Sequence, residues 1–196
     1  MTARIRNISL MALLLCILSG AGNLFGQAVE VAIEKQYPLL LKSISFDRNF
    51  SDKLEDNKRV VIGIVYQEKF RRSVREKETL IKEILDLENA DHTKYPVTYR
   101  LIPVDEGLSE DVRIQIQSSS IMYATSLKGV DIDELGDITR ANNVMSVAMV
   151  PEDCRAGLTM SFVQSGSRAR LLIHLRAARA EGCNFSSQLL KIANTF

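Results

Sequence analysis

The sequence predicts an α/β fold: a mostly parallel sheet with helices on both faces and a C-terminal antiparallel hairpin at the edge. Three observations lead to this prediction. The run Val-Val-Ile-Gly-Ile-Val at 60–65 is continuously apolar, as in a strand buried on both faces of a parallel sheet. Segments of strand and helix character alternate from there to residue 150. Residues 158–173 hold two alternating apolar stretches around Gln-Ser-Gly-Ser, which is typical of a hairpin.

Residues 1–28 have the pattern of a signal peptide. Arg4 and Arg6 form a positive start, and 8–18 is an apolar run too short to span a bilayer comfortably. Gly-Gln-Ala at 26–28 offers small residues for cleavage. An uncleaved membrane anchor is the alternative. A cleaved signal peptide predicts that the protein is exported to the periplasm.

The mature chain, residues 29–196, is expected to form a single α/β domain. A helix is expected to begin at Pro38, because the residue before a proline is disfavoured in the α conformation. The polar segment 50–58 predicts a loop. After the strand at 60–65, further strands are expected at 95–104, 120–125 and 144–150.

Helices are expected between these strands and after the hairpin. Apolar residues at helical spacing predict them at 73–87, 131–142 and 175–181, with a closing helix capped by Ser186 and Ser187. The stretch 108–118 fits both a strand and a helix. Val112 and Ile116 belong to an alternating pattern typical of a strand, and they also share one face of a helix. Helix is favoured there, because the parallel strand that follows requires a crossover connection.

Composition argues against a nucleic-acid partner. The chain has 25 Lys and Arg against 24 Asp and Glu. No cluster of basic residues in the sequence exceeds what a solvated helix face carries. An apolar content of 46% with 25% charged residues is ordinary for a folded globular domain.

The motifs of common catalytic and cofactor sites are missing from the sequence. Gly63 is isolated within a strand and does not belong to a phosphate-binding loop. Ser165 lies in a hairpin turn and not in a nucleophile elbow. His174 lies in a strand and is interpreted as structural, while Glu152 and Asp153 are expected in a solvated turn. The sequence therefore predicts a protein that is not an enzyme and holds no cofactor or metal.

Two cysteines, Cys154 and Cys183, remain after the leader is removed. The oxidising environment outside the cytoplasm permits a disulfide between them. The alternative is two separate, partly buried thiols. The sequence leaves both arrangements open.

The most specific stretch is GLTMSFVQSGSRARLLIHLRAARAEGCNFSSQLLKIA, at 157–193. It resembles the C-terminal signature of the YfiR family of periplasmic proteins, with a Gly-Leu strand, a tight hairpin, an Ala-Ala helix and a closing Ser-Ser-x-Leu-Leu-x-x-Ala helix. YPLLLKSISFDRNF at 37–50 and VVIGIVYQEKF at 60–70 are also similar to the family. One departure is His174, which stands where the family is expected to have Asn.

Four residues are expected at a partner or ligand surface. In an open α/β sheet such sites lie beyond the carboxyl ends of the strands. Tyr66 and Gln67 follow the first strand, and Tyr123 and Ser126 lie at the end of the third. The tyrosines would offer polar-tipped aromatic rings for recognition. The alternative is that they cap the core.

The resemblance implies a regulatory protein that acts by protein contact. Members of the family are periplasmic repressors that bind the outer part of a membrane-bound signalling protein, such as a diguanylate cyclase or a sensor kinase, and hold it inactive. A small-molecule binding module resembling half of a periplasmic substrate-binding protein is the alternative function. A small-molecule ligand and a homodimer are left open.

The leader carries the first testable prediction. If 1–28 is a cleaved signal peptide, N-terminal sequencing of the exported protein will give a start close to Gln27 or Val29. Recovery of the intact Met1 terminus in the membrane fraction would instead show the uncleaved anchor.

Overall fold

The computed structural model describes residues 31–54, 58–89, 95–105 and 107–196, so the predicted signal peptide lies outside the described residues. In this part of the chain, seven strands form one sheet in the order β2-β1-β3-β4-β5-β6-β7. The strands are β1 (Val60–Tyr66), β2 (Val97–Pro103), β3 (Ile121–Ala124), β4 (Met145–Ala148), β5 (Met160–Ser165), β6 (Arg168–Ile173) and β7 (Asn194–Thr195).

The predicted mixture of parallel and antiparallel pairing is confirmed. Strands β2, β1, β3, β4 and β5 run parallel to one another, and β5 and β6 form the antiparallel hairpin. The two-residue strand β7 pairs in parallel with the end of β6, so the hairpin has a short neighbour at the edge. The pairing of β6 with β7 brings the C-terminus of the chain back onto the sheet.

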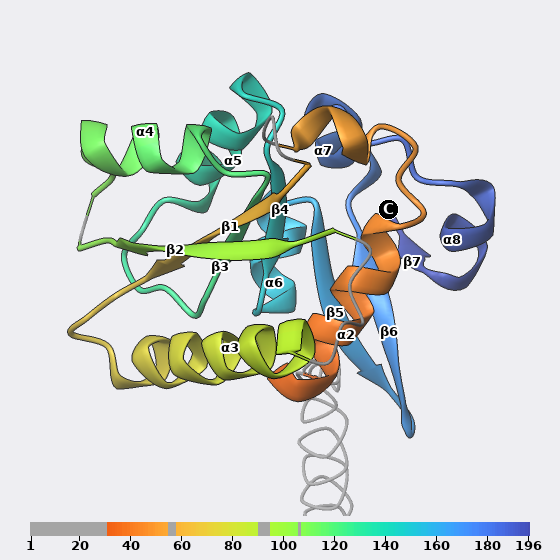
Figure 1. Ribbon diagram of the computed structural model, residues 1–196, viewed down its shortest axis with the longest axis horizontal. Coiled ribbons are helices and arrows are strands. Elements are labelled where there is room, and N and C mark those ends of the chain that lie inside the picture. The colour runs from red at the N-terminus through yellow and green to blue at the C-terminus, as the bar shows by residue number, and fades with distance from the viewer. Residues whose placement is uncertain (1–30, 55–57, 90–94, 106) are drawn as a thin grey trace, which may run out of the picture.

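Helices cover both faces of the sheet, as predicted (Figure 1). Helices α2 and α3 pack on one face, and α4, α5 and α6 pack on the other. The helices are α2 (Ile33–Ile44), α3 (Arg71–Asn89), α4 (Glu110–Gln117), α5 (Ile132–Ala141), α6 (Pro151–Ala156), α7 (Leu175–Ala180) and α8 (Ser187–Ile192), with a 3₁₀ turn η1 at Phe50–Lys53. None of the described helices combines the length and apolarity needed to cross a bilayer.

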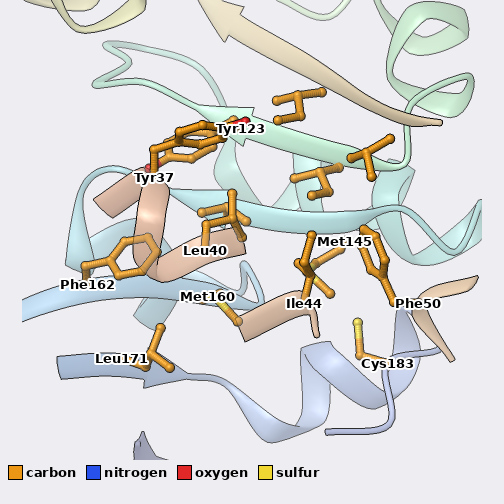
Figure 2. Close-up of a cluster of buried hydrophobic side chains, with 14 of the residues drawn as sticks. Tyr37, Leu40, Ile44, Phe50, Tyr123, Met145, Met160, Phe162, Leu171 and Cys183 are labelled. Carbon is orange, nitrogen blue, oxygen red and sulfur yellow. The ribbon is translucent and has the colours of Figure 1, made fainter. Parts of the chain in front are cut away.

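The sheet separates two hydrophobic cores. Successive side chains of a strand point to opposite faces, so Ile64 of β1 belongs to the first core and Val65 to the second. The first core holds Tyr37, Phe162 and Cys183 (Figure 2). Every residue of β1 is buried, which confirms the interpretation of the run 60–65 as a strand covered on both faces.

Several local predictions were wrong, among them the placement of His174 in a strand, since His174 is the N-cap of α7. Helix α2 begins at Ile33 and continues through Pro38 instead of starting there. The buried face formed by Tyr37, Leu40 and Ile44 packs against the sheet, and this packing outweighs the hydrogen bond that a proline removes. The segment after β4 is helix α6, with Pro151 at its first turn, and not only a solvated turn.

The ambiguous stretch at 108–118 is a helix, as favoured. Helix α4 spans Glu110–Gln117, with Ser109 as N-cap and Val112 and Ile116 buried. It connects β2 to β3, which pairs on the other side of β1. The crossover requirement of parallel pairing therefore predicted the helix correctly.

Gly63 provides a test of the packing around β1. A Cβ added there would lie 2.5 Å from Ser119 Oγ and 2.8 Å from Ile102 Cδ1. We expect Gly63→Ala to lower the free energy of unfolding by about 1–3 kcal/mol through overpacking, measured by urea denaturation. Gly107→Ala is the matched control, because nothing lies within 4 Å of its added Cβ. Equal effects of the two substitutions would contradict close packing at Gly63.

Candidate functional site

The order of the parallel strands places a crevice between β1 and β3. The chain passes from β1 through α3 to β2 on one side, and then through α4 to β3 on the other side of β1. The loops that leave the carboxyl ends of β1 and β3 therefore diverge. Ligands of open α/β sheets bind at such a switch point. Of the four residues predicted to contact a partner, Gln67 and Ser126 lie in these two loops.

The side chain of Gln67 lies in this crevice. Its Nε2 donates to the carbonyl oxygens of Asp105 (3.1 Å) and Lys128 (2.8 Å), and its Oε1 accepts from the N–H of Lys128 (2.7 Å). Asp105 follows β2 and Lys128 follows β3. One buried amide thus joins the loops that leave three adjacent strands.

A second set of polar contacts fixes the start of α3 to the end of β3. The hydroxyl oxygens of Ser73 and Thr125 lie 2.6 Å apart, and Ser73 Oγ also accepts from the N–H of Gln67 (2.8 Å). Glu76 accepts from both the N–H (2.6 Å) and the hydroxyl (2.7 Å) of Ser126. Ser126 is therefore buried and hydrogen-bonded within the protein.

Both tyrosines are buried, and Tyr123 belongs to the first core, which corrects the expectation that they lie at a recognition surface. Tyr123 is fully buried, and its hydroxyl donates to Oε1 of Gln36 (2.8 Å). Tyr66 is 7% exposed, and its hydroxyl donates to Glu68 (3.3 Å). Burial raises the pKa of both phenols, and the carboxylates of Glu68 and Glu76 add to the rise for Tyr66 and Tyr123 respectively. Tyr123 lies between Ile64 and Val147 in the sheet, which is why its place at a strand end did not make it accessible.

A pocket of about 560 Å³ opens outward from the Gln67 amide. Its lining residues are Gln67, Lys69, Phe70, Asp105 and Lys128. Lys69 pairs with Asp105 at 3.7 Å, and the ammonium group of Lys128 lies 4.3 Å from the centre of the Phe70 ring. The outer part of the pocket is therefore charged, while its inner end is the hydrogen-bonded amide of Gln67.

The two cysteines are separate buried thiols in this structure, and no bridge joins them. Cys154 belongs to the core on one face of the sheet and Cys183 to the core on the other. Burial raises the pKa of Cys154 to about 12 and raises that of Cys183 as well. Of the two arrangements that the sequence left open, the structure has the separate thiols, because the sheet lies between the two side chains.

Another buried carboxylate, Glu181, holds the C-terminal segment to the sheet. It accepts from Thr139 Oγ1 (2.7 Å), Ser146 Oγ (2.5 Å) and the N–H of Ser146 (2.8 Å). Burial raises its pKa, and these hydrogen bonds partly oppose the rise. Within the described ranges, no three His, Cys, Asp or Glu side chains gather closely enough to hold a metal ion.

A match over most of the chain identifies the family. The model of the YfiR/HmsC-like family matches residues 39–194. The chain belongs to this family. The match includes Gln67, Glu76 and Glu181, so the polar contacts described above lie in the part shared with YfiR/HmsC-like proteins. No curated protein sequence matches the chain.

Two solved structures have a similar fold. The first is the ABC domain from Streptococcus pneumonia in complex with L-Trp, with a TM-score of 0.57 and 11% identity over 83% of this chain and 61% of that one. The second is a conserved domain protein from Vibrio cholerae O1 biovar El Tor, with a TM-score of 0.53 and 16% identity over 86% of this chain and 60% of that one. The YfiR/HmsC-like chain thus spans about three fifths of each. At these identities the likeness shows the fold alone.

The sequence did not reveal Ser73, Glu76, Thr125 or Glu181 as parts of polar networks. Glu76 and Glu181 are ordinary helix residues in sequence, with no spacing that distinguishes them from solvated charges. Their burial depends on the strand order, which brings α3 against the end of β3 and places Glu181 against β4. Gln67 was found because it directly follows a buried strand.

The Gln67 amide can be tested by truncation. Gln67→Ala removes three hydrogen bonds and leaves two carbonyls and one N–H at the crevice, so we expect about 1–3 kcal/mol loss in the free energy of unfolding. Gln117→Ala on the exposed face of α4 is the control and should change stability by less than about 0.5 kcal/mol. Urea denaturation measures both. An unchanged midpoint for Gln67→Ala would mean that the amide does not join the loops in solution.

Proposed function

We propose that the mature protein is a periplasmic regulator that binds the outer part of a membrane-bound signalling protein and changes its activity by contact. Membership of the YfiR/HmsC-like family supports this proposal, because the match spans residues 39–194. The resemblance seen in the C-terminal segment points to a diguanylate cyclase or a sensor kinase as the partner. The proposal includes export by cleavage of residues 1–28.

The observation that best supports the proposal is that a side chain of the protein itself lies in the crevice between β1 and β3. The position at which open α/β sheets hold a ligand is occupied by the amide of Gln67, which hydrogen-bonds to Asp105 and Lys128. What remains accessible beyond this amide is the pocket of about 560 Å³, which has charged side chains of the strand-end loops at its rim. Such a rim suits recognition of a macromolecular surface, where charge complementarity guides association and excludes wrong partners.

Regulation of this kind requires a preference between two states of the partner. A protein that binds both conformations equally shifts neither, so the repressor must bind the inactive form more tightly. A preference of about 1.4 kcal/mol changes the ratio of the two forms tenfold. No covalent chemistry is needed, which agrees with regulation by contact.

A small-molecule binding module is the second candidate, and the pocket favours it. Its volume of about 560 Å³ lies within the range of small-molecule sites. One of the similar folds, the ABC domain, was solved in complex with L-Trp. Three of the five lining residues in the described part of the chain are charged, which makes the pocket more polar than such sites usually are. A homodimer remains a prediction under either candidate.

Deletion of the gene in its host tests the regulatory function. We expect the deletion to raise the cyclic-di-GMP level several-fold, because a repressor of a cyclase has been removed. The full-length gene should restore the original level, whereas a version lacking residues 1–28 should not, because it stays in the cytoplasm. Unchanged cyclic-di-GMP and unchanged sensor activity, with a metabolite co-purifying with the protein, would replace this function with the binding module.

A further inference from the structure

The charged residues of helix α3 are distributed opposite to what the helix dipole favours. The start of a helix is partially positive and favours acidic residues, while its end favours basic ones. Helix α3 has no acidic residue in its first turn and no basic residue in its last. By contrast, α4 begins with Glu110 and Asp111, and α5 carries Asp133 and Glu134 in its first turn. Helix stability therefore does not explain the charges of α3.

These charges form a basic patch at the carboxyl edge of the sheet. We define it by five exposed residues: Lys69, Arg71, Arg72, Arg75 and Lys128. Four of them lie at or just before the start of α3, and Lys128 comes from the loop after β3. The patch is therefore assembled by the fold from two distant parts of the chain.

The patch borders two hollows. Lys69 and Lys128 line the pocket of about 560 Å³ next to Gln67. Arg72 and Arg75 line a second pocket of about 440 Å³ on the side of α2. Basic side chains at the rims of concave surfaces concentrate a positive potential there, which attracts acidic groups.

The nearby carboxylates offset only part of the charge of the patch. Glu76 is buried and is held by Ser126 and Arg72. Asp105 pairs with Lys69 through exposed groups at 3.7 Å, an arrangement that water screens strongly. Among the described residues, Arg71 and Arg75 form no ion pair. Glu68 accepts from the Tyr66 hydroxyl, and Glu34 lines the second hollow with Arg72 and Arg75. The positive excess of the patch therefore rests on Arg71, Arg75 and Lys128.

An acidic polypeptide fits this surface better than a bilayer does. Side chains that protrude from a protein can reach into a hollow, whereas a flat membrane surface meets only the rim. Membrane-binding surfaces also insert large apolar side chains. The exposed large apolar residues of the described chain are Leu85, Leu101, Ile114, Ile192 and Phe196, and none belongs to the patch.

We propose that the basic patch docks an acidic segment of the partner protein, with Asp or Glu side chains entering the pocket between Lys69 and Lys128. This inference rests on the proposed function, because it names the chemistry of the partner that the regulator contacts. The Phe70 ring beneath Lys128 provides an apolar wall for the aliphatic part of a Glu side chain. Docking there would also place the partner directly over the Gln67 amide that joins the three loops.

The test is charge reversal measured against a defined probe. The patch variant Lys69→Glu, Arg71→Glu, Lys128→Glu is compared with a control variant, Arg168→Glu, Arg170→Glu, Arg179→Glu, which changes the net charge equally at exposed positions elsewhere. The probe is a fluorescent hexaglutamate peptide, followed by anisotropy in 50 mM and 500 mM NaCl. We expect the wild type and the control to bind at low salt and weaken at high salt, and the patch variant to bind at least about tenfold more weakly.

Three outcomes in solution would overturn the docking proposal. Equal weakening in both variants would show a response to net charge alone. Displacement of the peptide by millimolar inorganic phosphate would indicate a site for small anions. Binding to phosphatidylglycerol vesicles without binding to hexaglutamate would indicate a membrane surface. Circular dichroism and thermal melting of each variant establish that the compared proteins are folded.

An experiment in the host separates this inference from the proposed function. If the patch variant is expressed in the deletion strain and fails to restore cyclic-di-GMP, while the control variant restores it, the patch is the docking surface. If both variants restore it, the patch proposal is wrong and the regulatory function stands. If the deletion itself leaves signalling unchanged, the proposed function fails, whatever the peptide measurement gives.

Discussion

The structure depends on one constraint, which is that β1 is buried on both of its faces. A strand without an exposed face can carry no charged side chain, and both sides of the sheet must be covered by helices. The result is two separate hydrophobic cores, one on each side. This separation explains why Cys154 and Cys183 remain apart, although both lie in the last third of the chain.

The same constraint moves the polar chemistry to the ends of the strands. The first side chain after β1 that can make polar contacts beyond the sheet is that of Gln67, and it joins the loops after β2 and β3. Glu76 joins helix α3 to the end of β3 by accepting hydrogen bonds from Ser126. The buried side chains of Gln67 and Glu76 are hydrogen-bonded, as the cost of burying such groups requires. The carboxyl edge of the sheet is thereby closed by the protein itself.

The net charge of the chain does not reveal the basic patch at the carboxyl edge of the sheet. The composition is nearly neutral, with 25 basic and 24 acidic residues, and suggests no charged partner. The fold nevertheless places the basic start of α3 beside Lys128 and withdraws Glu76 into the interior. Function in such folds resides in the site and not in the sheet, because similar sheets support unrelated activities. The local surface is therefore a better guide to the partner than the net charge.

The sequence by itself determined the fold class, the strand at 60–65, the hairpin and the family, because apolar periodicity and turn residues are local properties. It also located Gln67 and Ser126 at strand ends. Only the tertiary structure decided that Tyr123 is buried, that Pro38 lies within a helix, and that the basic patch exists. Those outcomes depend on which strands are neighbours and on which face each helix packs, and such contacts join residues far apart in the chain. Local spacing cannot encode them, because the same pattern is compatible with several strand orders.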